Sequence, residues 1–561
     1  MNQSHRTPAR AFAVVMLALL VFQVWLRGHA FWPTVRPLAG FDPYFVTSPE
    51  AEPLDCDEAI YGYIGGRLAR GSVMYRDLTE NKPPGGYWIF ATAVSLGGPH
   101  ELTIHLLPLP FVLATTLMVG WIARKVAGNF AGCLASFVAI VVSTDPFLYG
   151  ESANMEHLVN TFSIAALATW IRWWNGDRSR RGGLIATGAL VALAALVKQT
   201  AILQIIVFGA VVGLRVDADQ AGGRGRKERA LDGLALVSGL VGIFTIVALI
   251  LVWQGASRAA FEDIVWYGSA LARETPPPPN APHAAIRWLT GNAAPDGQLP
   301  WPFGSTRYLV WWGTGTWPIW LASLALLFTV TTGRFAESQR RVLAGWTLIA
   351  MLQVVLPGLY WQHYYLLPVP GLALLHGVGL TDQLGRVALV RWRAPVSAVF
   401  ALTLLTAIGW TIRLQVREYL LVRPVDLVQD RGGPQWLANR ALGRALAQRT
   451  RDWPVRPTLF VWGWQGPLYF YSDFDCVTPQ VFVDDFLRAF ADQGHAQATP
   501  RIERTMRDLR DRPPTFLFVA YPPFDDLRSF MQERYVPSIL AAGLWVDRRF
   551  AGAFESAVGT R

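Results

Sequence analysis

Long apolar runs constrain the fold of this chain more than any other feature. The runs at 11–26 and 231–253 come close to or exceed the ~20 residues that an α-helix needs to cross a bilayer. Of the 561 residues, 52% are hydrophobic and 16% are charged, whereas soluble chains carry roughly a quarter charged residues. The sequence therefore predicts a polytopic α-helical protein of the cell membrane. The first run lacks a small-residue cleavage site, so we expect it to be a retained anchor.

The apolar runs predict about eleven spans, at 11–26, 104–123, 130–148, 157–174, 183–198, 200–215, 231–254, 308–330, 341–358, 365–380 and 394–412. Five short connections carry two to five lysines and arginines each, whereas the connections at 149–156, 199 and 359–364 carry none. The positive-inside rule places the basic connections and the N-terminus in the cytoplasm. An odd number of spans then leaves the C-terminus outside. The basic residues behind the net charge of +10 are explained by the orientation of the spans in the membrane, so no nucleic-acid partner is expected.

The chain divides into a membrane domain at 1–414 and a C-terminal domain at 415–561. In the second part, helix-like segments alternate with short β-rich runs, which predicts an extracytoplasmic α/β domain. The membrane domain carries a first outer loop at 27–103, in which the short run 86–98 is expected to be interfacial or re-entrant. A second outer loop at 255–306 contains consecutive prolines, which predict an irregular loop over the membrane surface.

Three carboxylates fall within five residues of the first outer loop, at Asp55, Asp57 and Glu58. A helix is predicted to follow Asp57, because the next apolar residues recur on one helical face. One interpretation makes Asp57 an N-cap, since the backbone N–H groups of a helix N-terminus favour a carboxylate. The other makes it a base that accepts a proton from an acceptor hydroxyl. Three acids exceed what capping requires, which favours the second.

Only four of the 50 basic residues are lysines, so the positions of Lys82 and Lys198 are informative. Lys82 is either an interfacial lysine or a cation for a lipid phosphate. Lys198 closes an apolar span, and its expected partner is Glu156 or a bound phosphate. Glu156 opens a span, where a carboxylate is a functional hypothesis or a first-turn helix acid. His363 is typical of an interfacial aromatic belt, with a ligand or base role as the alternative.

Two of the three cysteines, Cys56 and Cys476, are both predicted to lie outside the cytoplasm. They could form a disulfide in an oxidising compartment. A disulfide would tie the acidic loop to the C-terminal domain.

Several of these residues form a pattern that resembles the first outer loop of the GT-C class of membrane glycosyltransferases. The nearest branch is the protein-mannosyltransferase-like family that includes bacterial aminoarabinose transferases acting on lipid A. The pattern comprises Asp57-Glu58-x-x-Tyr61, Gly71-x-x-x-Tyr75-x-Asp77, Lys82-Pro83-Pro84-x-x-Tyr87, Asn154-Met155-Glu156, Lys198-Gln199-Thr200 and the segment from Tyr364 to Pro370. It covers most of residues 50–380, and the run from Val461 to Trp464 followed by Tyr469 resembles the soluble tail of that family.

The resemblance implies transfer of a sugar from a polyprenyl-phosphate donor to a lipid, glycan or protein acceptor on the outer face. Asp57 would be the catalytic carboxylate in an inverting displacement, and Glu156 a second acid near the acceptor. The implied substrate-binding residues are Glu58, Tyr61, Lys82, Tyr87, Lys198, His363 and Tyr364, with both lysines on the donor phosphate. His105 replaces an arginine of many relatives, and Asn81 replaces a glutamate of the aminoarabinose branch, which argues against that substrate.

No cofactor is predicted with certainty, and a divalent metal beside the acids stays open because no ligands beyond carboxylates are evident. The alternative function is a multi-span transporter or lipid flippase, whose ionisable residues should lie near the bilayer midplane. A further alternative is a non-catalytic surface protein whose C-terminal domain binds a partner. Loss of a sugar modification when Asp57 is substituted would favour an enzyme over both the transporter and the surface protein.

Overall fold

The computed structural model describes residues 6–28, 52–176, 180–213, 225–274, 337–357, 361–387 and 435–559 apart from 493, with isolated residues at 319–327 and 402–416. The chain forms two compact units, each assembled from three segments. The helical unit comprises 1–41, 108–247 and 277–423, and the α/β unit comprises 42–107, 248–276 and 424–561. The α/β unit thus draws on both predicted outer loops, while the predicted domain boundary at residue 414 stays a prediction.

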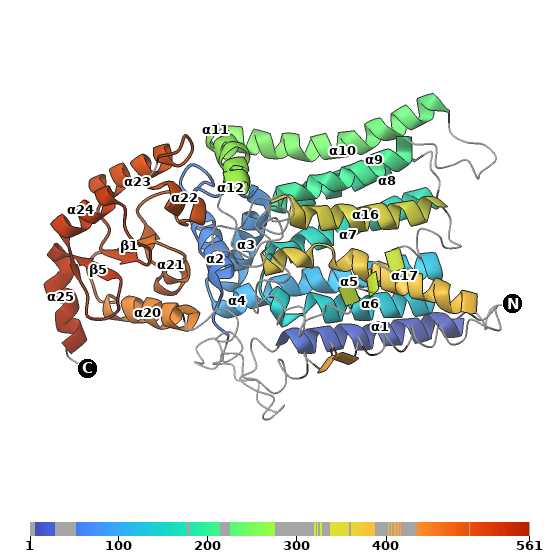
Figure 1. Ribbon diagram of the computed structural model, residues 1–561, viewed down its shortest axis with the longest axis horizontal. Coiled ribbons are helices and arrows are strands. Elements are labelled where there is room, and N and C mark those ends of the chain that lie inside the picture. Colours follow the sequence, from blue (N-terminus) through green and yellow to red (C-terminus); the bar gives the residue numbers. More distant parts are fainter. Residues whose placement is uncertain are drawn as a thin grey trace, which may run out of the picture. The chain divides into compact units, whose positions relative to one another are not determined.

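The helical unit is built from antiparallel and crossing helices (Figure 1). Its described elements are α1 (Arg6–Arg27), α5 (Pro108–Ala127), α6 (Asn129–Ser143), η3 (Pro146–Leu148), α7 (Met155–Trp174), α8 (Gly182–Val197), η4 (Gln199–Leu203), α9 (Gln204–Gly213), α10 (Arg226–Trp253), α16 (Glu337–Val355), η6 (Gln362–Leu366) and α17 (Val369–Val387). Helix α17 packs on α5 and α6, α7 packs on α5 and α8, and α16 packs on α9 and α17.

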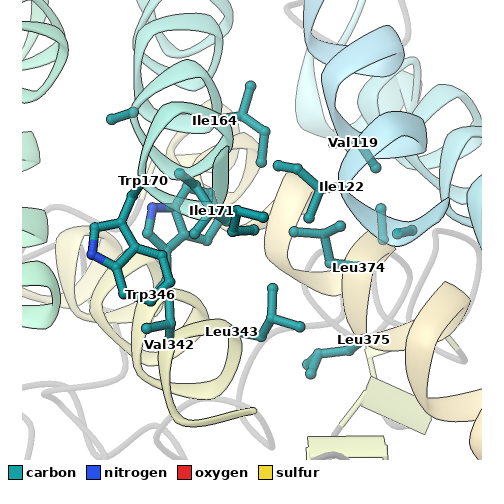
Figure 2. Close-up of a cluster of buried hydrophobic side chains, with 14 of the residues drawn as sticks. Val119, Ile122, Ile164, Trp170, Ile171, Val342, Leu343, Trp346, Leu374 and Leu375 are labelled. Atoms are coloured by element: carbon teal, nitrogen blue, oxygen red, sulfur yellow. The ribbon is translucent and has the colours of Figure 1, made fainter. Parts of the chain in front are cut away.

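A continuous apolar core joins these helices (Figure 2). Trp170 stacks on Trp174 with ring centroids 4.9 Å apart, and both rings are buried. Trp346 of α16 and Leu374 of α17 belong to the same buried cluster. In contrast, α1 and α10 expose apolar side chains along their length, including Leu17 and Leu249. Such surfaces need a lipid environment, because contiguous exposed apolar patches are rare on soluble monomers.

Among the residues that the structure describes, four helices are long and apolar enough to cross a membrane: Arg10–Arg27, Glu101–Ala127, Arg226–Trp253 and Gln362–Leu384. Four apolar helices are shorter: Asn129–Ser143, Gly182–Val197, Gln199–Gly213 and Val342–Val354. The helical membrane class is therefore supported. The count of about eleven spans stays a prediction, since the predicted spans 308–330 and 394–412 fall mostly outside the described residues.

The α/β unit contains a five-stranded sheet with the order β2-β1-β3-β5-β4. Strands β1 (Thr458–Trp462), β2 (Asp475–Cys476) and β3 (Phe516–Val519) are parallel, and β5 (Leu544–Asp547) pairs antiparallel with β3 and with β4 (Tyr535–Pro537). Around it lie α20 (Gln435–Arg449), α21 (Pro467–Ser472), α22 (Asp485–Phe490), α23 (Thr499–Asp511), α24 (Asp525–Arg534) and α25 (Arg548–Gly559). The alternation predicted from the sequence is thus present in residues 435–559.

The rest of the α/β unit comes from the predicted outer loops. The first contributes α2 (Cys56–Ala69), α3 (Pro84–Gly97) and α4 (Glu101–Leu106), and the second contributes α11 (Ser257–Phe261), the π-helical turn η5 (Glu262–Tyr267) and α12 (Gly268–Glu274). The prediction of an irregular loop at 255–306 is therefore wrong for 257–274, because the prolines begin only at Pro276. The remainder of that loop lies outside the described residues.

Candidate active site

Two acids of the cluster cap α2, and the third carboxylate, that of Asp57, takes no part in the cap. Asp55 is the N-cap of α2: its Oδ1 accepts the Glu58 N–H at 2.8 Å, and Glu58 Oε2 accepts the Asp55 N–H at 3.1 Å. This is a complete capping box. The interpretation of Asp57 as the N-cap is therefore wrong, because the extended residue that opens the helix is Asp55. Asp57 lies in the first turn and is half-buried, outside the box.

Lys82 lies at the start of the next helical segment with an aromatic face and a carboxylate beside it. Its Nζ is 3.7 Å from Glu80 Oε1 and 5.2 Å from the ring centroid of Tyr61. The Tyr75 hydroxyl donates to the Lys82 carbonyl at 2.8 Å and so fixes the main chain. The Lys82 side chain is 21% exposed, so its ammonium is accessible from solvent.

The electrostatics around Cys56 and Tyr87 connect these groups. Burial raises the pKa of the Cys56 thiol well above its usual range; the Asp57 and Asp55 carboxylates raise it further, and Lys82 opposes them. Burial likewise raises the pKa of Tyr87, with Glu80 and Asp57 contributing. Asp57 therefore acts on both buried groups, together with Lys82 at Cys56 and with Glu80 at Tyr87.

Close packing of α2 on α3 positions both ends of this site. A Cβ at Gly65 would lie 2.8 Å from the Phe90 carbonyl carbon, so only glycine allows this approach. Tyr61 packs edge-on against Tyr87 and Phe90, with centroids 5.8 and 5.5 Å away. Tyr61 and Tyr87 are both buried, and the Tyr61 ring is the one that faces the Lys82 ammonium.

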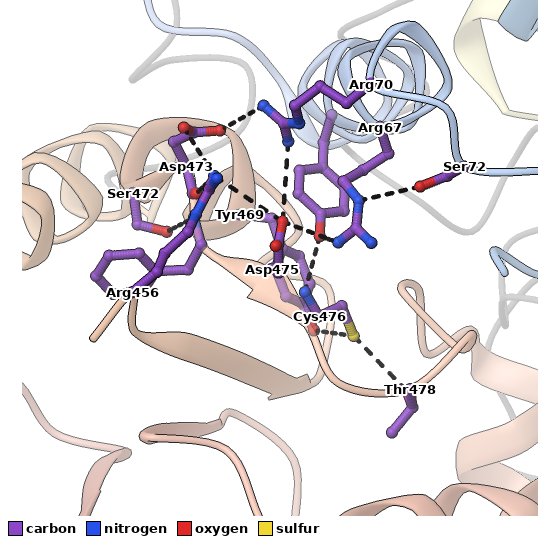
Figure 3. A network of polar contacts seen from close by, with 12 residues as sticks. Arg67, Arg70, Ser72, Arg456, Tyr469, Ser472, Asp473, Asp475, Cys476 and Thr478 are labelled. Carbon is purple, nitrogen blue, oxygen red and sulfur yellow. Dashed lines mark hydrogen bonds and ion pairs between the residues drawn. The ribbon is translucent and has the colours of Figure 1, made fainter. Parts of the chain in front are cut away.

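The C-terminal sheet holds the far end of α2 through a polar network (Figure 3). Arg67 donates to Asp475 at 2.9 Å and to the Tyr63 hydroxyl at 3.2 Å, and that hydroxyl also accepts the Cys476 N–H at 2.8 Å. Asp473 pairs with Arg70 and with Arg456, each at 3.0 Å. Since these contacts come from α2, α21 and β2, the sheet orients the helix that carries Asp57.

The two cysteines of this unit are free thiols with separate partners. Cys56 donates to the Trp464 carbonyl at 2.9 Å. The Cys476 sulfur contacts the Tyr469 hydroxyl at 3.3 Å. The disulfide considered from the sequence is therefore not formed here. His105, the replacement for an arginine of relatives, is buried with its Nε2 3.1 Å from the Glu52 carbonyl and its Nδ1 3.7 Å from Glu58 Oε1.

A second charged cluster lies in the helical unit. Lys198 Nζ donates to Glu156 Oε1 at 2.5 Å, and the side chains are only 6% and 3% exposed. The Lys198 ammonium also lies 3.2 Å from the ring centroid of Tyr364, a cation–π contact. His363 stacks edge-on against Tyr364 with centroids 4.9 Å apart and lies within electrostatic reach of Glu156. Of the two partners expected for Lys198, Glu156 is in direct contact with it, and the bound phosphate stays a prediction.

Irregular backbone places this second cluster. Lys198 adopts an extended conformation between α8 and η4, which breaks the helix and turns its side chain out of the helical register. The Asn160 amide of α7 donates to the Leu366 carbonyl at 2.8 Å, which anchors η6 and hence His363 and Tyr364. Non-helical backbone at membrane depth is tolerated only where protein or water satisfies its polar groups.

Sequence reasoning missed two residues that complete these clusters. Glu80 supplies the carboxylate next to the Lys82 ammonium. It precedes Lys82 by two residues, and this short spacing is the sequence signal that could have identified it. Arg27 is buried and donates to the Gly150 and Glu151 carbonyls at 2.5 and 3.1 Å, thereby fixing the loop before α7. A single arginine that ends the first apolar run is the corresponding signal.

The predicted site residues thus fall into two sets. Asp57, Glu58, Tyr61, Lys82 and Tyr87 lie in the α/β unit. The helical unit holds Glu156, Lys198, His363 and Tyr364. Across the residues that the structure describes, no group of three or more His, Cys, Asp or Glu side chains could hold a metal ion.

The chain is similar to known glycosyltransferases both in sequence and in structure. Residues 81–217 match the sequence profile of the dolichyl-phosphate-mannose-protein mannosyltransferase family. The crystal structure of ArnT from Cupriavidus metallidurans bound to undecaprenyl phosphate superposes with a TM-score of 0.56 at 16% identity, covering 96% of this chain and 98% of ArnT. This chain has a GT-C glycosyltransferase fold.

A second GT-C structure agrees. The oligosaccharyltransferase AglB from Archaeoglobus fulgidus, in complex with an inhibitory peptide and a dolichol-phosphate, has a TM-score of 0.51 at 12% identity over 90% of this chain and 69% of AglB. No curated protein matches the chain in sequence. The resemblance predicted from the outer-loop motifs is therefore confirmed by the fold and by the family profile.

Proposed function

We propose that this GT-C chain is a glycosyltransferase that moves a sugar from a polyprenyl-phosphate donor to an acceptor on the outer face of the membrane. The proposal rests on the different roles of the three acids at the start of α2. Asp55 and Glu58 complete the cap, while Asp57 lies outside the box, and Asp57 and Lys82 both act on the pKa of the buried Cys56 thiol, in opposite directions. A carboxylate and a cation in one charged site are the groups that a phosphate-leaving displacement needs.

The comparisons support the donor class that we propose. ArnT was crystallised with undecaprenyl phosphate and AglB with a dolichol-phosphate, and both ligands are isoprenoid phosphates. A lipid-linked donor needs no nucleotide-binding loop, and the sequence contains no glycine-rich phosphate motif. We assign the donor phosphate to Lys82, with Tyr61 and Tyr87 in the same unit, and to Lys198, with His363 and Tyr364 in the helical unit. Glu58 supports the helix that carries Asp57.

The proposed reaction is a single displacement. The acceptor hydroxyl oxygen attacks the anomeric carbon, the bond from that carbon to the phosphate oxygen breaks, and Asp57 takes the hydroxyl proton. The lysine ammonium groups stabilise the charge that builds on the departing phosphate. Attack opposite the leaving group inverts the anomeric configuration. Glu156 is assigned to the acceptor, and its ion pair with Lys198 keeps it ionised in a buried place.

The decisive test is mass spectrometry of envelope lipids, polysaccharides and proteins from a strain that lacks this chain. We expect one sugar mass to disappear and to return with the wild-type chain but not with Asp57→Asn at equal expression. Asp55→Asn is the matched control, because asparagine also caps helices. Full rescue by Asp57→Asn would support a scaffold. Substrate-dependent flux in sealed vesicles, with no altered sugar, would support a transporter.

A further inference from the structure

The α/β unit contains a cavity that the donor site does not use. Its volume is about 390 Å³, within the range of small-molecule sites. Four pieces of chain line it: the segment 75–79, the helices α11 and η5, the loop 479–480 and the region 496–505, mostly α23. None of the residues assigned to the donor phosphate is among the lining residues.

One wall of this cavity is the π-helical turn η5. Glu262, Asp263, Trp266 and Tyr267 of this turn all line the cavity. These positions are spaced i, i+1, i+4 and i+5, so they share one side of the turn. Single π-helical turns are frequent at functional sites. Trp266 is 56% exposed, so a large aromatic face is available at the opening.

The opposite wall is a fixed arginine. Arg501 of α23 pairs with Asp263, and its guanidinium carbon lies 3.7 Å from the ring centroid of Tyr267. The Tyr267 hydroxyl in turn donates to both oxygens of Asp484, at 3.0 and 2.8 Å. The guanidinium is held by a carboxylate and by a ring that is itself anchored. Such a preorganised wall loses little entropy when a ligand binds.

The lining charges leave one cation in excess. Arg258 pairs with Glu262 at 2.8 Å and Arg501 pairs with Asp263. Arg504 is exposed and makes no ion pair with any residue in the described part of the chain. The cavity therefore offers a guanidinium for an anion. The exposed Trp266 ring suits the apolar face of a ring that carries hydroxyl groups.

We propose that this cavity binds a sugar ring that bears one anionic group, with Arg504 on the anion and Trp266 on the ring face. The anion is a carboxylate or a phosphate, which share the geometry that arginine recognises. Tyr75 lines the cavity and its hydroxyl holds the Lys82 carbonyl, so the sugar lies beside the segment that carries Lys82. Binding at this cavity does not depend on sugar transfer.

The test measures binding to the full chain in nanodiscs by saturation-transfer NMR and calorimetry. The probes are methyl glucuronide, glucose 6-phosphate and neutral methyl glucoside. We expect at least one anionic probe to bind roughly tenfold or more tightly than the neutral one. The stronger of the two anionic probes identifies the anion.

Three variants locate the site. Trp266→Ala should abolish binding of all probes, and Arg504→Gln should remove the preference for the anionic ones. Arg507→Gln is the matched control, since Arg507 is an exposed arginine of the same helix outside the cavity. Both site residues are exposed, so the variants should keep the wild-type melting temperature. The proposal is overturned if no probe binds the folded chain, if the neutral probe binds equally, or if Trp266→Ala and Arg504→Gln bind like the wild type.

Discussion

The two charged clusters neutralise their lysines in different ways. In the helical unit, Lys198 makes a direct ion pair with Glu156 at 2.5 Å, and both side chains are almost fully buried. In the α/β unit, Lys82 lies 3.7 Å from Glu80 and keeps 21% of its side chain exposed. Under the proposed function, Lys198 would meet the donor phosphate only by sharing or leaving Glu156, whereas the contact of Lys82 with the Glu80 carboxylate is longer and more exposed.

The largest effect is expected from Asp57→Asn. Because the amide cannot accept the acceptor proton, the turnover number should fall by about 10²- to 10⁴-fold, while the affinity for polyprenyl phosphate stays within about twofold. Steady-state transfer assays and lipid-phosphate titration measure the two quantities. Asp55→Asn, which removes a nearby carboxylate but keeps the cap, should retain activity. Equal losses in both variants would show that the local charge, not a base, is what matters.

Lys198→Met tests whether the buried pair is as tightly coupled as its geometry indicates. Removing one partner leaves Glu156 as an uncompensated buried charge, which typically costs about 3–5 kcal/mol of unfolding free energy. The double variant Glu156→Gln with Lys198→Met should recover a large part of that loss. Thermal unfolding in nanodiscs measures both. If the single and double variants unfold alike, the pair does not contribute as a unit.

Lys82→Met tests the partly exposed lysine of the α/β unit. The loss of a charged hydrogen bond to phosphate should weaken donor binding by roughly tenfold or more. Stability should change by about 1 kcal/mol or less, because the Lys82 side chain is partly exposed and Glu80 is at a long distance. Titration with polyprenyl phosphate and a melting curve give the two numbers. A large stability loss with unchanged donor affinity would assign Lys82 to folding.

Two carboxyls of the α/β unit make its stability depend on pH. Burial raises the pKa of Asp484 to about 6, and that of Asp263 to about 6. A raised carboxyl pKa contributes stability that is complete below about pH 4 and is lost as the pH rises through 6. Asp484→Asn should therefore stabilise the chain by about 1–2 kcal/mol at pH 7.5 and have little effect at pH 4. Tryptophan-monitored melting at both pH values is the measurement. A destabilisation at pH 7.5 that is absent at pH 4 would mean that Asp484 is needed as an ionised acceptor.

The smallest effect concerns the cap of α2. Asp55→Ala removes the acceptor of the capping box and should cost about 1 kcal/mol, whereas Asp55→Asn should cost only a few tenths. Because the cap lies beside Asp57, the alanine variant should also lower the transfer rate modestly. Equal melting temperatures for the two variants would contradict the capping assignment.

Local pattern predicted the helix after the acids but not which acid caps it. Asp55 and Asp57 are chemically alike, and the cap is decided by which residue is extended when the helix begins. The pairing of Lys198 was predicted only as far as an anion, since Glu156 is 42 positions away and their contact depends on how α7 and α8 pack. Glu80 and Arg27 were missed because their local signals, a spacing of two residues from Lys82 and a place at the end of an apolar run, do not say which groups they contact.

The sequence by itself determined the membrane class, the α/β character of residues 435–559 and the GT-C resemblance, because hydrophobic length, β-rich runs and short motifs are local properties. The tertiary structure alone decided that Gly65 must admit the backbone of α3, that the C-terminal sheet orients α2 through Arg67, and that a π-turn and α23 enclose a separate cavity. Each of these features joins residues far apart in the chain, and such contacts are selected by packing and by the need to neutralise buried charge.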